Sequence, residues 1–232
     1  MTDADVTNIF DGVFQVPDPR NPNKRILATR NLDPGRSGYG EALVRRKLVE
    51  FRSWDPFRSK LSAAILNGLE HFPFAPGTHC LYLGASTGTT VSHLSDIVGN
   101  NGIIFAVEVA ARVARELLEN VTKYRKNVVP IIEDASHPER YPAIYGRVTA
   151  VYADVAQPDQ TLIAIQNCSM FLESHGLLFL VVKASSIDVT KSKQEVFGDQ
   201  VALLERSSFN LLEQIDLEPY DKNHAMIVAS KN

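Results

Sequence analysis

The 232-residue chain has only two cysteines, one tryptophan and no apolar run near the roughly 18 residues that a membrane span needs. Cys80 and Cys168 cannot build a disulfide framework or a cysteine-rich zinc site, and both lie in apolar stretches typical of buried free thiols. The chain also begins without the apolar core of a secretory signal. We therefore expect a cytoplasmic protein with no bound metal and no membrane contact.

Two glycine-rich phosphate-binding motifs are missing as well. The sequence contains no Gly-x-Gly-x-x-Gly and no Gly-x-x-x-x-Gly-Lys. The first absence makes a nicotinamide-dependent dehydrogenase a distant alternative. The second argues against a nucleotide held by its phosphates.

Positive charge is scarce overall but locally concentrated. The formal net charge is −3, yet residues 20–60 hold 11 Lys or Arg against 4 Asp or Glu, and the remainder holds 13 against 23. This asymmetry indicates either a salt-bridged face or a surface that attracts phosphate groups. The candidate phosphate-facing residues are Arg45, Arg46, Lys47, Arg52 and Arg58.

The composition changes near residue 55. Residues 1–55 are rich in Pro, Asn, Gly and Arg around short apolar pieces, which predicts a small β-rich module. Residues 56–232 begin with a helical pattern over 57–72 and then alternate seven apolar strand patterns with helical ones. Continuous apolar runs such as residues 177–182 are typical of strands buried on both faces. We therefore predict an α/β fold with a doubly wound, Rossmann-like, seven-stranded sheet.

A glycine loop follows the first strand of this predicted sheet. Residues 84–90 read GASTGTT, in which Gly84 allows close backbone approach and Thr89 and Thr90 open the next helix with hydroxyl groups. Ligands of open α/β sheets bind beyond the carboxyl ends of the strands. The loop is therefore a candidate ligand contact.

Carboxylates follow the next three strands. Glu108 can accept hydrogen bonds from both hydroxyls of a ribose, Asp134 can accept from an exocyclic amino group, and Asp154 ends the fourth strand. With the glycine loop they describe a nucleoside pocket without a phosphate site. A nucleoside ligand of this kind points to S-adenosyl-L-methionine, whose sulfonium is compatible with nearby carboxylates.

Two lysines and a histidine complete the polar set. Lys60 lies before the first strand, Lys183 ends the fifth strand, and His224 precedes the last one. Because ends of neighbouring strands meet at one sheet edge, we expect Lys183 to lie beside Asp154 and to be held by it. An amine in this position can act as a general base.

The longer motifs resemble the fibrillarin family. They are WDPFRSKLSAAIL, LYLGASTGTTVSHLSDIVG, IIEDASHPERY, YADVAQPDQT, FLVVKASSID and LEPYDKNHAMIV, and the resemblance spans residues 54–230. The chain contains only 13 glycines and no Gly/Arg-rich extension, so it is similar to the archaeal members. The resemblance implies a class I S-adenosylmethionine-dependent methyltransferase fold.

The resemblance also implies an activity and a site. The family transfers methyl groups to ribose 2′-oxygens of ribosomal RNA, and in archaea also of transfer RNA. By motif position, Lys60, Asp154, Lys183 and His224 would be catalytic. The cofactor contacts would be Thr89, Thr90, Glu108, Val109, Asp134, Ala135, Asp154, Val155, Ala156 and Gln157. We expect Lys183 to assist deprotonation and Lys60 and His224 to orient the ribose.

No motif for reading base edges is visible in the sequence. The resemblance implies that a box C/D guide RNA pairs with the target RNA, that a Nop-family scaffold protein docks on the methyltransferase, and that a ribosomal-type kink-turn-binding protein joins them. Two alternatives stay open at this point. One is a methyltransferase acting on protein or a small molecule, and the other is a non-catalytic assembly module.

Overall fold

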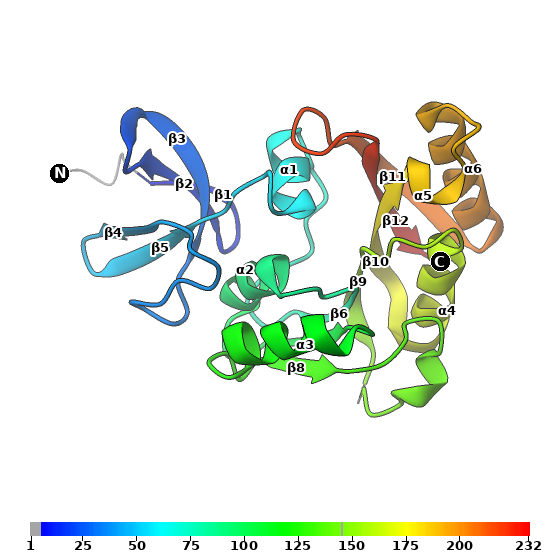
Figure 1. Ribbon diagram of the computed structural model, residues 1–232, viewed down its shortest axis with the longest axis horizontal. Helices are drawn as coiled ribbons and strands as arrows, with labels where there is room; N and C mark the ends of the chain where they lie inside the picture. Colours follow the sequence, from blue (N-terminus) through cyan, green and yellow to red (C-terminus); the bar gives the residue numbers. More distant parts are fainter. Residues whose placement is uncertain (1–5, 145) are drawn as a thin grey trace.

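Two β-sheets organise the chain in the computed structural model, which describes residues 6–144 and 146–232. The first five residues of the predicted N-terminal module lie outside the described residues. Figure 1 shows the smaller sheet on the left and the larger sheet with its helices on the right. No helix in the described ranges is long and apolar enough to cross a membrane.

The N-terminal sheet is antiparallel throughout, with strand order β1-β2-β3-β5-β4. The predicted β-rich module is thus confirmed, while its boundary between residues 55 and 56 stays a prediction. Its strands are β1 (Thr7–Phe10), β2 (Val13–Asp18), β3 (Asn21–Arg30), β4 (Leu43–Arg46) and β5 (Val49–Ser53).

The larger sheet has seven strands in the order β11-β12-β10-β9-β6-β7-β8. β12 runs antiparallel to β10 and β11, and the remaining pairs are parallel. The predicted doubly wound, seven-stranded fold is therefore confirmed. The strands are β6 (His79–Leu83), β7 (Ile103–Val107), β8 (Val128–Ile131), β9 (Val148–Ala153), β10 (Leu172–Lys183), β11 (Phe209–Asp216) and β12 (His224–Lys231).

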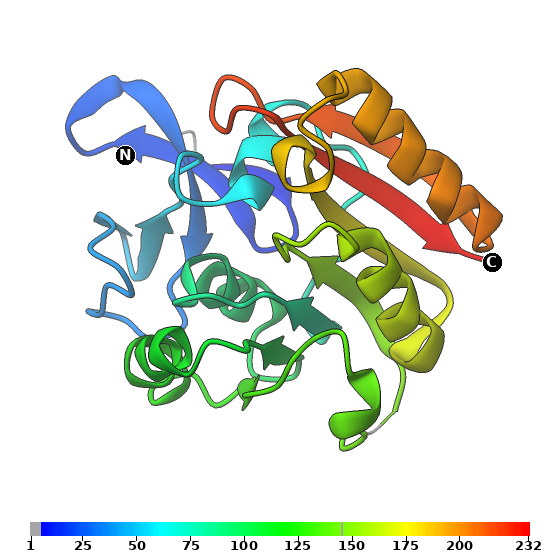
Figure 2. The same cartoon turned by 45° about the vertical axis from the view of Figure 1, so that its right-hand side comes forward.

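Helices cover both faces of this sheet. α1, α2 and α3 lie on one face, and α4 and α6 lie on the other, with the short α5 and the π- and 3-10 turns in the connections (Figure 2). The helical elements are α1 (Lys60–Leu66), α2 (Thr89–Val98), α3 (Ala111–Leu117), η2 (Leu118–Thr122), η3 (Pro138–Arg140), α4 (Gln160–Phe171), α5 (Ala184–Ile187) and α6 (Lys193–Arg206).

The first helix is much shorter than the helical pattern over 57–72 predicts. Ser59 caps its N-terminus, and Gly68 follows its C-cap with a φ of +97°. This left-handed conformation is open to glycine and ends the helix, so the apolar residues beyond it pack from a loop. At the start of α6, Ser192 and Glu195 form a capping box.

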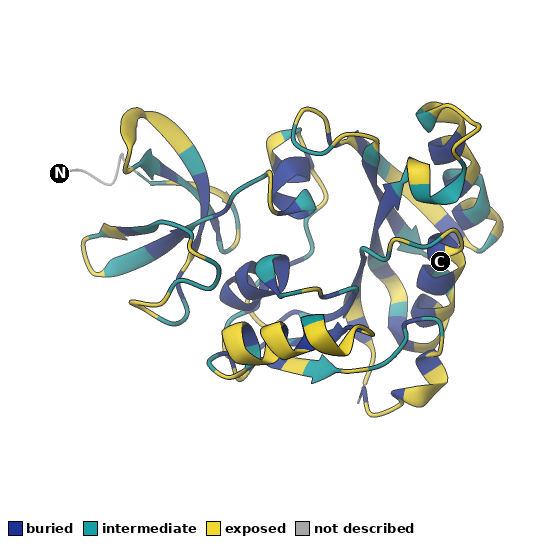
Figure 3. Cartoon of the chain, viewed as in Figure 1, coloured by how far each residue is buried: buried dark blue, intermediate teal, exposed yellow. Residues whose placement is uncertain are grey.

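Successive side chains of the central strands point to opposite faces of the large sheet, so its core has two layers. Cys80 and Tyr82 of β6 face the α1–α2 side, while Leu81 and Leu83 face the α4–α6 side. Both cysteines are buried and free, as predicted. Figure 3 shows the buried strands between helices that are exposed only on their outer surfaces.

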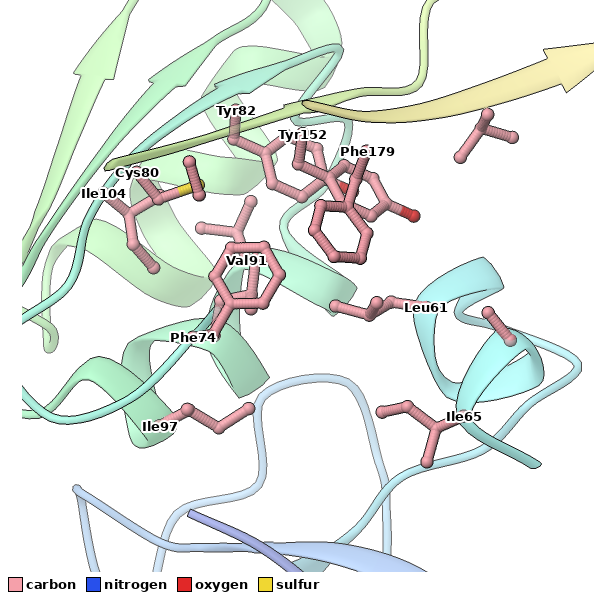
Figure 4. Packing of buried hydrophobic residues seen from close by; sticks show 14 of the residues in the cluster. Leu61, Ile65, Phe74, Cys80, Tyr82, Val91, Ile97, Ile104, Tyr152 and Phe179 are labelled. Atoms are coloured by element: carbon pink, nitrogen blue, oxygen red, sulfur yellow. The ribbon is translucent and has the colours of Figure 1, made fainter. Parts of the chain in front are cut away.

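The α1–α2 layer continues into the N-terminal sheet. Figure 4 shows Leu61 and Ile65 of α1 near Phe179 and Phe74. Val13, Leu27 and Trp54 of the N-terminal region belong to the same buried cluster. The two sheets therefore share one of the hydrophobic clusters.

A buried ionic cluster also joins the two sheets. The carboxylate of Asp96 on α2 accepts hydrogen bonds from Arg52 (2.9 Å) and Arg125 (2.5 Å). Thr29 Oγ1 donates to it at 2.7 Å, and the backbone N–H of Leu32 at 2.9 Å. The Asp96 and Arg52 side chains are 0% exposed, so charge pairing and hydrogen bonding together compensate their loss of water.

His93, one turn before on α2, is locked in one tautomer. The only Thr29 hydroxyl proton goes to Asp96, so Thr29 Oγ1 accepts from His93 Nδ1 (2.7 Å). His93 Nε2 then accepts from the Tyr39 hydroxyl, also at 2.7 Å. Burial, with Arg52 and then Arg125 adding to it, holds the pKa of His93 well below its usual value. The ring is neutral and stacks on Trp54 at 4.9 Å.

The Asp96 cluster generates a stability prediction. Asp96→Asn leaves two buried guanidinium groups without their shared counter-charge, so we expect the free energy of unfolding to fall by about 3–5 kcal/mol. Chemical denaturation measures this change. Glu116→Gln, which removes the same charge from the exposed face of α3, is the matched control and should stay within about 0.5 kcal/mol of the parent. Equal effects of the two changes would contradict the role of the cluster.

The neutral state of His93 generates a pH prediction. In the unfolded chain His93 titrates near its usual pKa of about 6.5 and binds a proton that the folded chain does not. Stability should therefore be full above about pH 6.5 and fall below it, by up to about 1.4 kcal/mol per pH unit from this group. Denaturation curves at several pH values for the parent chain and His93→Gln test this. The parent should lose stability more steeply on acidification, and parallel losses would refute the assignment.

Candidate active site

The loop after β6 lies where the strand order of the large sheet reverses. Gly84 has a φ of +79°, and a Cβ there would stand 2.3 Å from the Asp154 carbonyl oxygen. The N–H groups of Gly84 and Ala85 both donate to the Val107 carbonyl, at 3.0 and 2.9 Å. The loop is thus wedged between the ends of β7 and β9, and glycine is required for the close approach.

The start of α2 is tied to the start of α1. Gly88, the N-cap of α2, has a φ of +91°, and a Cβ there would meet Val121 at 2.6 Å and Leu117 at 2.7 Å. The Thr90 hydroxyl lies 3.0 Å from the hydroxyl of Ser59, and both residues are buried. The free N–H groups of α2 therefore face the strand ends from a fixed position, with Thr89 at the first helical residue.

Glu108 stands at the end of β7 and is held by two backbone donors. Its two carboxylate oxygens accept from the N–H groups of Ser86 and Ala110, each at 2.8 Å. A carboxylate has about four acceptor positions, so two remain for hydroxyl donors. Val109 follows with 58% of its surface exposed, leaving an apolar face beside this carboxylate.

Asp134 follows β8 in a tight turn. Its Oδ1 accepts from the backbone N–H (2.9 Å) and the hydroxyl (2.7 Å) of Ser136, which lower the pKa of the carboxyl and keep it ionised. Among the described residues no donor reaches Oδ2. The carbonyl of the buried Ala135 accepts from the side-chain amide of Asn167 at 2.8 Å, which fixes the turn.

The segment after β9 is the fourth one at this edge of the sheet, after those that follow β6, β7 and β8. The Asp154 N–H donates to the Leu83 carbonyl at 3.0 Å, and the Gln157 N–H donates to the Val155 carbonyl at 3.1 Å. Ala156 is exposed on the turn. The predicted contact residues thus lie at the carboxyl ends of β6 to β9, although the roles assigned to them stay predictions.

Lys60 and Asp154 form the ion pair of the site. Lys60 Nζ lies 3.0 Å from Oδ1 and 2.7 Å from Oδ2 of Asp154, 94 residues away in sequence. The two side chains are 25% and 24% exposed, so the pair is shielded but reachable. Lys60 is the first residue of α1, and its position depends on the packing of that helix against β12 and the N-terminal region.

Lys183 and His224 lie opposite each other at the adjoining strand ends. They are register partners across β10 and β12. Leu180 pairs with Ala153 across β10 and β9, which places Lys183 near the end of β9. Among the described residues, however, the structure records no ion pair between Lys183 and Asp154. The expectation that Asp154 holds Lys183 is therefore wrong, because the carboxylate is taken by Lys60.

A neighbouring carboxylate that the sequence analysis missed orients His224. Nδ1 of His224 lies 2.8 Å from the Lys222 carbonyl and 2.8 Å from Asp221 Oδ1. Both partners are acceptors, so Nδ1 carries the proton and Nε2 is the nitrogen left to accept one. The Asp-x-x-His spacing of residues 221–224 was the available signal.

A further contact connects both sides of the site. The side-chain amide of Asn67, at the end of α1, donates to the carbonyls of Asp216 (2.7 Å) and Glu218 (2.9 Å). Asp216 is the last residue of β11, and Glu218 lies in the connection that leads to His224. Figure 1 and Figure 2 show α1 beside this connection.

The five predicted phosphate-facing residues divide among three places. Arg45, Arg46 and Lys47 lie on the β4–β5 hairpin, and Arg58 is exposed just before α1. Arg52 is fully buried between Glu41 and Asp96, so its assignment to the phosphate-facing surface is wrong. Its charge is compensated by these two carboxylates inside the protein, and the neighbouring sequence gave no sign of this pairing.

The family model "Fibrillarin" matches residues 5–232. The chain belongs to the fibrillarin family. A Pyrobaculum calidifontis relative named fibrillarin-like rRNA/tRNA 2′-O-methyltransferase is 52% identical over 206 residues, with 88% of each chain covered. The predicted family and fold class are thus confirmed.

Solved fibrillarin structures resemble the whole chain. The Methanococcus jannaschii fibrillarin pre-rRNA processing protein matches with a TM-score of 0.93 and 39% identity, covering 100% of this chain and 99% of that one. Aeropyrum pernix fibrillarin, solved with natively bound S-adenosyl-L-methionine, matches at 0.87 and 41%, covering 97% and 98%. A fibrillarin/Nop5p complex matches at 0.81 and 39%, covering 89% and 94%.

Proposed function

We propose that the chain transfers a methyl group from S-adenosyl-L-methionine to the ribose 2′-hydroxyl of ribosomal and transfer RNA. The printed activity of the Pyrobaculum relative and the cofactor bound to the Aeropyrum fibrillarin support this proposal. The observation within the structure that carries it is the Lys60–Asp154 ion pair. The pair lies at the same sheet edge as the loop after β6 and the carboxylates of Glu108 and Asp134, which suit a nucleoside.

The residues present fit S-adenosylmethionine. Glu108 retains acceptor positions for two ribose hydroxyls, and Asp134 retains Oδ2 for an amino group. The exposed Val109 offers an apolar contact for a base. When bound, the cofactor would supply a methyl group already activated by its sulfonium.

The chemistry left to the protein is orientation and the removal of one proton. The ribose 2′-oxygen attacks the methyl carbon, the carbon–sulfur bond breaks with its electron pair going to sulfur, and the hydroxyl proton leaves. The Lys60 ammonium, fixed by both Asp154 oxygens, can stabilise charge that develops on the attacking oxygen. Nε2 of His224 is free to accept the proton, and the amine of Lys183, the register partner of His224, could accept it only in its neutral form.

Sequence choice requires partners, since direct base readout would need a motif that the sequence does not show. We propose that a Nop-family scaffold docks on the chain, supported by the solved fibrillarin/Nop5p complex. We further propose that a box C/D guide RNA selects the target by pairing and that a kink-turn-binding protein of the ribosomal type completes the particle. Pairing would then read sequence while the proteins recognise shape and backbone.

A guided methylation assay tests the function. The chain, scaffold, kink-turn protein and box C/D guide are incubated with labelled S-adenosylmethionine and two target strands. One strand carries a 2′-hydroxyl at the guided position, and its control carries a 2′-deoxy sugar there. We expect label only on the hydroxyl strand. Label on both strands, or on a protein component alone, would replace this proposal with a base or protein methyltransferase.

The Asp154–Lys60 pair predicts that methyl transfer depends on the charge of Asp154. Asp154→Asn keeps the shape of the side chain but removes its charge, so we expect methyl transfer to fall by about 10²–10⁴-fold. Particle assembly, followed by gel shift, should persist. Asp159→Asn is the matched control, because Asp159 is exposed on the same loop and makes no capping hydrogen bond. Loss of assembly together with activity would assign Asp154 a structural role instead.

A further inference from the structure

A cavity of about 420 Å³ lies between the N-terminal sheet and the methyltransferase domain. Its walls come from the β2–β3 hairpin, residues 39–42, residues 53–58, and Leu66 with Tyr220. In Figure 1 some of these segments can be followed as β3, the loop between β5 and α1, and the loop between β11 and β12. The strand-end residues that fit the cofactor do not line it, so the cavity is separate from the site described above.

The cavity presents positive charge that the protein does not neutralise. Four basic side chains line it, against three carboxylates. Among the described residues, Arg20, Lys24 and Arg58 make no ion pair with a carboxylate. One of the three acidic residues, Glu41, is neutralised from behind by the buried Arg52 at 2.5 Å. The excess charge is therefore available to an anionic ligand.

Aromatic rings lie among these charges. Phe57 is 70% exposed and meets the edge of Tyr220 at 5.2 Å between ring centroids. The Arg58 guanidinium lies over the Tyr39 ring at 4.6 Å and donates to the Tyr39 carbonyl at 3.1 Å. An exposed ring beside unpaired cations is typical of surfaces that hold the sugar–phosphate backbone and stack on bases.

Phe57 and Tyr220, which line the cavity, are close in sequence to two of the catalytic candidates. Phe57 comes three residues before Lys60, and Tyr220 comes four residues before His224. Their contact therefore joins the two chain segments that carry these side chains. Phe57, which lines the cavity, is therefore within three residues of Lys60, where the reacting ribose is proposed to lie.

We propose that the cavity binds the backbone of the RNA target strand next to the reacting ribose. Lys24 and Arg58 contact phosphates, and the exposed ring of Phe57 packs against an adjoining sugar or base. This inference rests on the proposed RNA methyltransferase function and adds a second contact site to it. An acidic protein segment would satisfy the charges, but it would not explain an exposed ring beside the site of ribose chemistry.

The experiment compares charge-matched variants in the assembled particle. Lys24→Gln combined with Arg58→Gln should weaken target-strand binding, measured by fluorescence anisotropy at about 0.1 M salt, on the order of tenfold. The slope of log affinity against log salt should become shallower by about 1.4, as expected for two lost phosphate contacts on a single strand. Lys126→Gln combined with Arg206→Gln removes the same charge from exposed sites outside the cavity and should leave both quantities unchanged.

Phe57→Leu tests the ring separately. It keeps an apolar side chain but removes the stacking surface, and we expect binding to weaken about fivefold or more with the salt slope unchanged. Cofactor affinity, measured by calorimetry, reports on folding and should match the parent in every variant.

Two outcomes would overturn the proposal. If the parent particle methylates its target and the cavity variants bind RNA like the control pair, the cavity assignment fails while the proposed function stands. If the cavity variants instead lose binding of the scaffold protein with target affinity intact, the cavity is a protein interface. Absence of methylation by the parent particle would count against the proposed function itself, a result distinguishable from both.

Discussion

The carboxylate of Asp96 is the contact on which the arrangement of the two sheets depends. It gathers Arg52 from the N-terminal sheet and Arg125 from the larger domain around one buried charge on α2. Such a cluster stabilises only when every partner is in place, since an isolated buried charge is costly. The apolar contacts of Val13, Leu27 and Trp54 bury additional surface between the two sheets. The ion pairs, which require a specific geometry, fix how the two sheets are oriented. The N-terminal sheet is thereby fixed to the helix whose first turn faces the strand ends.

A few hydrogen bonds connect this junction of the two sheets to Lys60 in the candidate active site. Trp54 ends the N-terminal region, and its carbonyl accepts from the Ser62 hydroxyl of α1 at 3.0 Å. Lys60 starts the same helix, and Ser59 before it contacts Thr90 of α2. The ammonium at Asp154 is therefore positioned by groups from both sheets. Gly84 completes the arrangement, because only a residue without a side chain lets the loop pass so close to the Asp154 carbonyl.

Much of this was predictable from residue patterns, and the failures have physical causes. Strand periodicity and the turns behind each strand predicted seven strands and the residues at their ends, because burial on two faces leaves a strong signal. The extent of α1 was overestimated, since apolar spacing continues past Gly68 while the backbone does not. Arg52 was assigned to the surface together with the other basic residues of its segment. Its burial depends on Asp96, which is 44 residues away, and no local pattern encodes that pairing. The partner of Asp154 was misassigned for the same reason.

The two hydrogen bonds of Asn67 have a mechanical consequence. They couple the end of α1 to the connection that precedes His224, while Lys60 occupies the other end of the same seven-residue helix. Lys60 and His224, which are 164 residues apart in sequence, are thus linked through this one helix. A change in the packing of α1 would therefore displace Lys60 and also disturb the segment that leads to His224.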